Sequence, residues 1–113
     1  MAYTEHSALR WAGHVVKEGM VVLYIPPPNV MQCLLAAPGC VVVGRVDQII
    51  QLHGTDHFVL CHRVFESGLV TFDGKKGVRV DSLQHRMHAI ELNTWSMTLA
   101  WPFPMGNHLA LVV

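Results

Sequence analysis

The chain carries a group of side chains that could bind a metal ion: His53, His57, Cys61 and His62. Imidazole nitrogen and thiolate sulfur are the ligands that zinc and other borderline metals favour. On a strand, His57 and Cys61 would share one face and His62 would point to the other, so at most two or three of them converge. The remaining ligands would come from elsewhere in the chain: His85, His88 or Cys40. The alternative is an ordinary strand with a buried thiol and half-exposed imidazoles.

A second histidine pair, His85 and His88, is spaced three residues apart. On a helix these side chains would share a face, where they could hold a metal or move a proton. A solvated helix face explains the spacing equally well.

A thiol nucleophile needs a base that can take its proton. Cys61 and His62 are adjacent, and adjacent residues of a strand point to opposite faces, so they cannot form a dyad. Cys33 stands near the start of an expected helix, whose N–H groups would lower a thiol pKa. No base can be assigned to it, and its aliphatic neighbours favour a buried, inert thiol.

Residues 61–74 run Cys-His-Arg-Val-Phe-Glu-Ser-Gly-Leu-Val-Thr-Phe-Asp-Gly. This stretch resembles the His-Arg-Val, turn and strand segment of the signal-peptidase and LexA-like serine peptidases. The resemblance implies His62 as a general base and Ser7 as a nucleophile. If the chain is an enzyme that uses histidines, the resemblance therefore implies that it could have a degenerate form of this peptidase fold.

The strongest candidate for a binding surface is an aromatic and proline-rich segment near the C-terminus. Trp101, Phe103, Pro104 and Met105 stand together there, and such residues are enriched where proteins or apolar ligands dock. Trp95 belongs to the same sequence region, and its strict alternation with polar residues favours a core position. The alternative for residues 101–105 is a rigid corner with no binding role.

Composition limits the class of protein. A length of 113 residues predicts one domain over residues 1–113. Half of the residues are apolar and only 14% are charged, against about 25% in an ordinary soluble domain, which indicates apolar surface that meets another chain. We therefore expect a homo-oligomer, most simply a dimer.

Several partners and locations are disfavoured. Equal numbers of acidic and basic residues argue against a nucleic-acid partner. No apolar run approaches the ~18 residues of a membrane span, and no phosphate-binding glycine motif indicates a cofactor. The first ten residues lack an apolar secretory signal, and the three cysteines are odd in number, so the expected location is cytoplasmic.

The remaining pattern predicts the elements that would position these side chains. We expect short helices over residues 4–19, 29–35 and, from a capping box at 81–84, over 85–88. The predicted strands span 20–25, 40–52 with a bulge at Gly44, 57–65, 69–73, 78–80, 89–93 continuing as 94–101, and 108–113, with a rigid loop over 102–107. The strands 40–52, 57–65 and 69–73 are expected to be neighbours in order.

The expected fold is mostly β (α+β): a small curved antiparallel barrel or roll of six to seven strands with two or three short helices. The function favoured by these patterns is a non-enzymatic binding or assembly module that self-associates and binds a small apolar ligand or protein partner. The alternative is a histidine-cluster enzyme, either metal-dependent or a degenerate peptidase.

Overall fold

A computed structural model describes residues 2–11, 13–25, 41–92 and 97–112 of the chain. These residues form eleven strands and one 3-10 turn. The elements are β1 (Tyr3–His6), β2 (Ala8–Trp11), β3 (His14–Lys17), β4 (Val21–Tyr24), β5 (Val42–Leu52), β6 (Phe58–Phe65), β7 (Val70–Phe72), β8 (Lys75–Arg79), η1 (Val80–Ser82), β9 (Leu83–Leu92), β10 (Met97–Met105) and β11 (His108–Val112). The expectation of a mostly β, antiparallel fold is confirmed, with more strands than the predicted six or seven.

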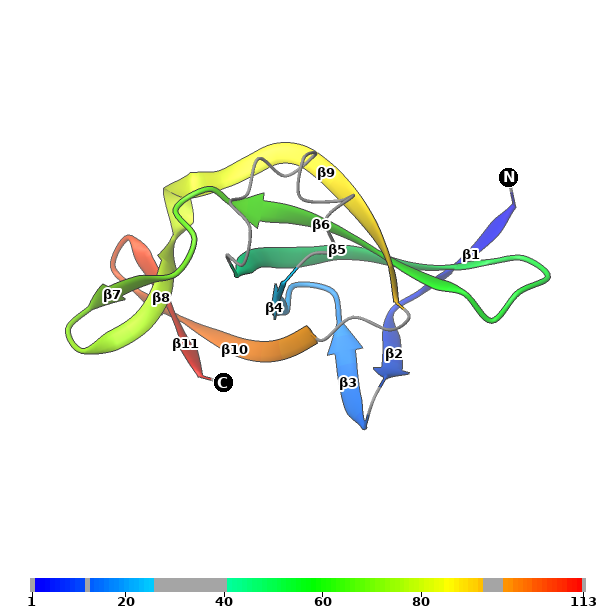
Figure 1. The fold of residues 1–113 in the computed structure, drawn as a ribbon, viewed down its shortest axis with the longest axis horizontal. Helices are drawn as coiled ribbons and strands as arrows, with labels where there is room; N and C mark the ends of the chain where they lie inside the picture. The colour runs from blue at the N-terminus through cyan, green and yellow to red at the C-terminus, as the bar shows by residue number, and fades with distance from the viewer. Residues whose placement is uncertain (1, 12, 26–40, 93–96, 113) are drawn as a thin grey trace.

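Nine of the strands form one antiparallel sheet (Figure 1). Its strand order is β7-β8-β11-β10-β4-β5-β6-β9, and β1 pairs with the C-terminal half of β5. β2 and β3 form a separate hairpin. Within the described residues β7 and β9 are the two ends of the strand order and do not pair, so the closed barrel among our expectations is not confirmed.

Strand β10 joins the two halves of this sheet. Its first residues, Met97 to Ala100, pair with β4, and its last residues, Trp101 to Met105, pair with β11. The prediction of a rigid loop over 102–107 is therefore wrong for residues 102–105, because β10 continues through Pro102 and Pro104 and only residues 106 and 107 form a turn. Proline is tolerated in a strand where its missing N–H faces an edge, and over this stretch β11 is the one described strand that pairs with β10.

Two apolar clusters lie on opposite faces of the sheet. The first core consists of Val16, Val22, Tyr24, Val42, Val46, Ile49, Leu60, Val64, Ile90 and Leu92. The second core consists of Val21, Val43, Phe65, Val78 and Ala100. Neighbouring residues of β4 alternate between the two, as expected where both faces of a strand are covered.

The helix predicted over residues 4–19 is wrong, because β1, β2 and β3 occupy this segment. Gly13 has φ +81°, a left-handed conformation that lets the chain reverse between β2 and β3. Leu9, Trp11 and Val16 then pack on the first core from the hairpin. Alternation of apolar residues across a hairpin determines this segment, rather than the helical spacing of its alanines and valines.

The helix predicted after Asp81 is also wrong. Asp81 caps nothing: its carboxylate pairs with Arg79, and η1 has no side-chain cap. β9 begins directly afterwards at Leu83, so His85 and His88 lie on a strand. The helix predicted over 29–35 lies outside the described residues.

Two further details of the sheet differ from expectation. The register shift of β5 lies between Val46 and Gln48, at Asp47, rather than at Gly44. β6 pairs with β5 and β9, whereas β7 pairs with β8, so the predicted order of three neighbouring strands holds only for its first pair. In the described part of the chain there is no helix of the length and apolar character needed to cross a bilayer.

Candidate functional sites

The four residues of the predicted metal site make separate local contacts. His53 Nε2 lies 2.8 Å from the Thr4 hydroxyl, and His57 Nδ1 contacts the carboxylate of Glu91. Cys61 and His62 point to opposite faces of β6, as a strand requires. No group of three or more His, Cys, Asp or Glu residues that could hold a metal is found among the described residues.

His62 is the one buried polar or charged side chain among the described residues, with 1% of its surface exposed. Its Nε2 lies 2.7 Å from the hydroxyl of Tyr24, inside the first core. Burial lowers the pKa of His62 from 6.5 to about 4 and raises the pKa of Tyr24. At neutral pH the tyrosine hydroxyl therefore stays protonated and donates a hydrogen bond to Nε2 of an uncharged imidazole.

The backbone of β5 makes room for this imidazole. A Cβ atom at Gly44 would lie 2.6 Å from His62 Cδ2, closer than real contacts allow. Gly44 is thus required because the buried His62 ring approaches the backbone closely. The sequence instead predicts a bulge as the reason for this glycine.

His88 is the cross-strand partner of His62, and their ring centroids are 6.0 Å apart. Partial burial, and secondarily the charge of Arg86, lower the pKa of His88. His85 is exposed and lies three positions away on the same strand, on the opposite face, so the two histidines do not form the pair that a helix would create.

The two candidate nucleophiles within the described residues, Cys61 and Ser7, do not form a dyad with a base. Burial, with the nearby charge of Asp47, raises the pKa of the Cys61 thiol, which disfavours the reactive thiolate. Ser7 is exposed in the bend between β1 and β2 and makes no hydrogen bond to His62, whose ring is buried. Cys33 and Cys40 lie outside the described residues, as does Trp95.

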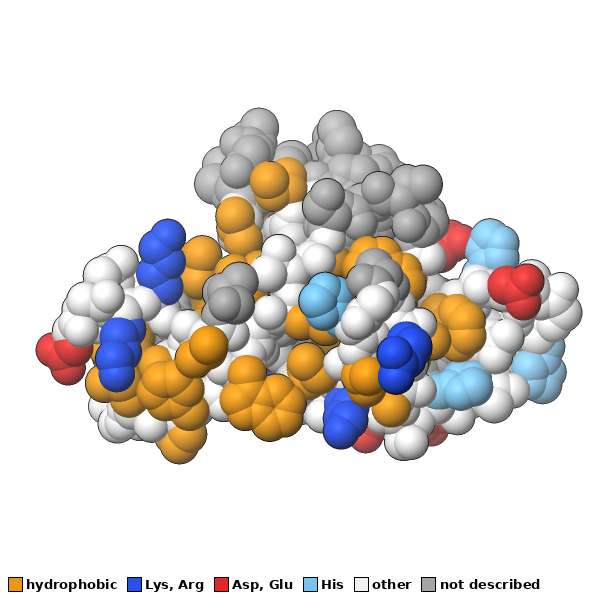
Figure 2. All heavy atoms as spheres, turned by 90° about the horizontal axis from the view of Figure 1, so that it is seen from below, with side chains coloured by type: hydrophobic (Ala, Val, Ile, Leu, Met, Phe, Trp, Pro, Cys, Tyr) orange, Lys and Arg blue, Asp and Glu red, His pale blue; other side chains and the backbone are white. Residues whose placement is uncertain are grey.

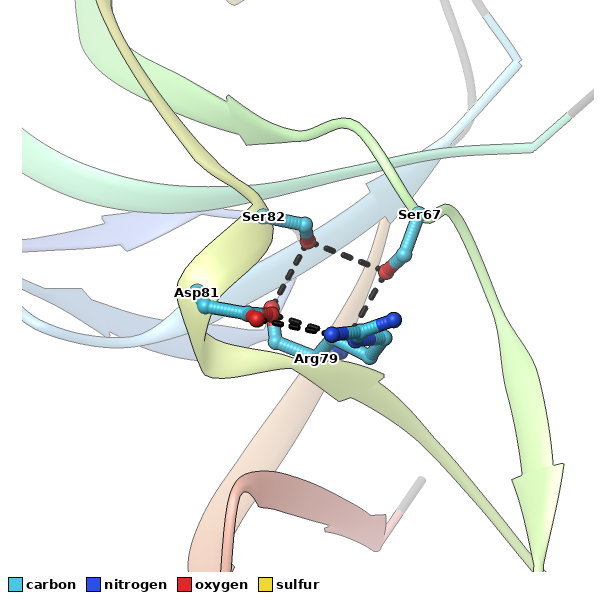
Figure 3. Close-up of polar contacts among 4 residues, drawn as sticks. All are labelled: Ser67, Arg79, Asp81 and Ser82. Atoms are coloured by element: carbon cyan, nitrogen blue, oxygen red, sulfur yellow. Dashed lines mark hydrogen bonds and ion pairs between the residues drawn. The ribbon is translucent and has the colours of Figure 1, made fainter.

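A polar corner links the turn after β6 to the end of β8 (Figure 3). Ser67 Oγ accepts a hydrogen bond from the Arg79 backbone N–H at 3.2 Å and lies 3.0 Å from Ser82 Oγ. The Ser82 hydroxyl also reaches the Arg79 carbonyl oxygen at 2.7 Å, and Arg79 pairs with Asp81. These contacts fix where β8 leaves the sheet and where β9 begins, so their role is to position strands. The spacing of the serines in the sequence does not predict this corner.

The four strands β7, β8, β11 and the second half of β10 present an apolar surface opposite the second core, here called the outer face. From the strand register it contains Val70, Phe72, Lys75, Gly77, Arg79, Trp101, Phe103, Met105, His108, Ala110 and Val112. Of the predicted binding residues, Trp101, Phe103 and Met105 lie on it, and Pro104 points to the other side of β10.

Exposure is concentrated at one end of the outer face. Trp101 and Val112 are cross-strand partners with 62% and 57% of their surface exposed. Elsewhere on the face, the Phe72 and His108 rings lie with their centroids 4.1 Å apart at an interplanar angle of 31°, and Lys75 Nζ lies 5.6 Å from the Phe103 ring centre. Figure 2 shows hydrophobic side chains gathered over this part of the molecule with basic side chains beside them.

The outer face ends in a hollow of about 470 Å³ between two hairpin turns. The hollow is lined by Phe72, Asp73, Met105, Gly106, Asn107 and His108. Its stacked rings and its thioether offer apolar contact to a docking group.

Comparison of the chain with protein-family models, with curated proteins and with solved structures found no match.

Proposed function

We propose that the chain is a non-enzymatic assembly module that self-associates through its outer face. The observation that carries this proposal is the apolar row along β10. Met97 and Leu99 pack against the first core, and on the same side of the strand the row continues as Trp101, Phe103 and Met105. The row is covered by this chain over its first half and exposed at Trp101, which lies beside exposed Val112.

A second copy of the chain is the partner best suited to this surface. The formal net charge at pH 7 is zero, with eight acidic and eight basic residues, so two copies approach without net repulsion. A large aromatic side chain in an apolar surround is typical of interface hot spots. Two such faces related by a twofold axis would each cover the other's tryptophan.

The assembly proposal predicts a specific loss of association in Trp101→Lys. A lysine there would bring a charge into the centre of the contact, and we expect the dimer dissociation constant to rise at least ~30-fold, corresponding to about 2 kcal/mol. Sedimentation velocity over a concentration series measures this constant. Met87→Lys is the matched control, because Met87 is an exposed apolar residue on β9, at the other end of the strand order.

Three outcomes would contradict the proposal. They are a monomeric wild-type protein at all concentrations, an unchanged dimer in Trp101→Lys, and an equal loss in Met87→Lys. A monomer that binds apolar probes in the hollow beside Met105 would instead favour a ligand-binding module.

The enzyme alternative makes the reverse prediction. If the chain is an enzyme, His57→Ala and His62→Ala should remove bound metal or abolish activity, while Trp101→Lys should leave both unchanged. Native mass spectrometry reports subunit number and bound metal together. A cytoplasmic location also remains a proposal, supported by the odd number of cysteines.

A further inference from the structure

Two arginines face each other across the middle of the main sheet. Arg45 on β5 and Arg63 on β6 are direct cross-strand partners. Their side chains lie on the face that carries the second core, next to the position of Val21 in the register. Like charges directly opposite each other in a sheet are destabilising, so this placement needs a compensating interaction.

Asp47 supplies only part of the compensation. It lies at the register shift of β5, and its two carboxylate oxygens accept one hydrogen bond each, from Arg45 Nε at 3.1 Å and from Arg63 Nε at 2.6 Å. One carboxylate between two guanidinium groups leaves one positive charge. The arrangement also fixes the orientation of both guanidinium planes.

Among the described residues, no group forms a hydrogen bond with the terminal nitrogens of either arginine. Each guanidinium binds Asp47 through Nε, and neither makes a further hydrogen bond to a described residue. The side chains of Arg45 and Arg63 are 34% and 29% exposed, so solvent and small solutes reach them, while partial burial strengthens their electrostatic interactions.

We propose that Arg45 and Arg63 form a binding site for a small phosphate-type oxyanion, either inorganic phosphate or a phosphate monoester. Guanidinium groups present their N–H donors in a fork that matches the spacing of phosphate oxygens. A tetrahedral anion can accept hydrogen bonds from both groups at once and balances the charge that Asp47 leaves. Asp47 acts as a positioning residue, because its oxygens hold the two Nε atoms and leave the outer nitrogens facing the ligand.

The neighbouring side chains fit an anion site and not a catalytic one. In the register, Cys61 follows Arg63 on the same face, with Gln48 as its partner, and Met87 lies opposite Arg63 on β9. The Cys61 thiol has a raised pKa, so it stays protonated and adds no negative charge. No step beyond binding is required of these residues.

The test is titration of the full chain with inorganic phosphate at constant ionic strength, followed by amide chemical shifts in two-dimensional NMR. We expect saturable shifts centred on residues of β5 and β6 around Arg45 and Arg63. Arg63→Gln should weaken binding at least ~10-fold, and Arg63→Lys, which keeps the charge and loses the fork, should weaken it by several-fold. Arg10→Gln removes the same charge from an exposed position on β2 and should leave the affinity within about twofold.

Thermal unfolding of each variant separates loss of binding from loss of folding, and Arg45→Lys provides a second variant if Arg63→Gln does not fold. Non-saturable shifts, shifts spread over all basic residues, or an equal effect of Arg10→Gln would overturn the proposal. So would a wild-type affinity in both lysine variants. The proposal is independent of self-association, which Trp101→Lys tests on a different face.

Discussion

Gly77→Ala is expected to lower the free energy of unfolding by about 3 kcal/mol, the upper part of the range for overpacking a filled site. A Cβ atom at Gly77 would lie 2.2 Å from the backbone oxygen of Leu109 and 2.7 Å from Phe72 Cε1. The phenyl ring can turn away, but the carbonyl belongs to the paired strand β11, so the ladder between β8 and β11 must open. Urea denaturation monitored by tryptophan fluorescence measures the loss.

Gly74→Ala in the same hairpin is the matched control. Gly74 has φ +71° and open space around it, so an added methyl group costs only the backbone strain, about 1 kcal/mol. The difference between the two variants isolates the clash. Equal losses in both variants would show that β8 can move away from β11 without penalty, and that the close approach at Gly77 does not hold the outer face together.

The second large effect is an acid-dependent loss of stability caused by His62. Its pKa is about 4 in the folded protein because of burial, against about 6.5 in the unfolded chain, so the unfolded state binds more protons between these values. The stability from this group is complete above about pH 6.5 and falls as pH drops toward 4. The total loss in the free energy of unfolding is about 3 kcal/mol, which is the shift of the His62 pKa multiplied by the free energy of one pKa unit.

His62→Gln removes the titration and keeps a side chain that can accept a hydrogen bond from Tyr24. We expect the free energy of unfolding of this variant to change less steeply with pH than that of the wild type between pH 4 and 6.5. The difference in slope corresponds to the uptake of up to one proton on unfolding. His14→Gln, at an exposed position of β3, controls for the loss of an imidazole. An NMR titration gives a direct check, since a His62 ring that protonates near pH 6.5 would contradict the burial argument.

The sequence predicted the mostly β, antiparallel character of the fold and several strands from residue 20 onward, because alternation and turn residues are local signals. β4, β5, β6 and β11 lie close to their predicted ranges. The helix prediction for the N-terminal segment is wrong because Ala8, Trp11 and Val15 fit a helical period as well as a strand. Only the pairing of β2 with β3 across Gly13 decides between helix and strand. Tertiary pairing overrode local preference there.

The candidate sites were predicted less well than the fold. Trp101, Phe103 and Met105 do share one surface, but the predicted strand ends at Trp101 and places Phe103 and Met105 in a loop, since alternate prolines usually end a strand. The neighbours of His62 and of Arg63 depend on register with residues far away in sequence, such as Tyr24, His88 and Arg45. Composition and local spacing hold no information on that register.

The placement of β10 next to β4 has a consequence for synthesis of the chain on the ribosome. β4 pairs with β5 on one side, and its other side is paired with Met97 to Ala100, which emerge some seventy residues later. Throughout that interval a nascent chain presents an open strand edge beside the residues of both cores, which is a template for pairing with other chains. Long-range closure of this kind slows folding, so assistance from a holding chaperone should matter most before residue 97 emerges.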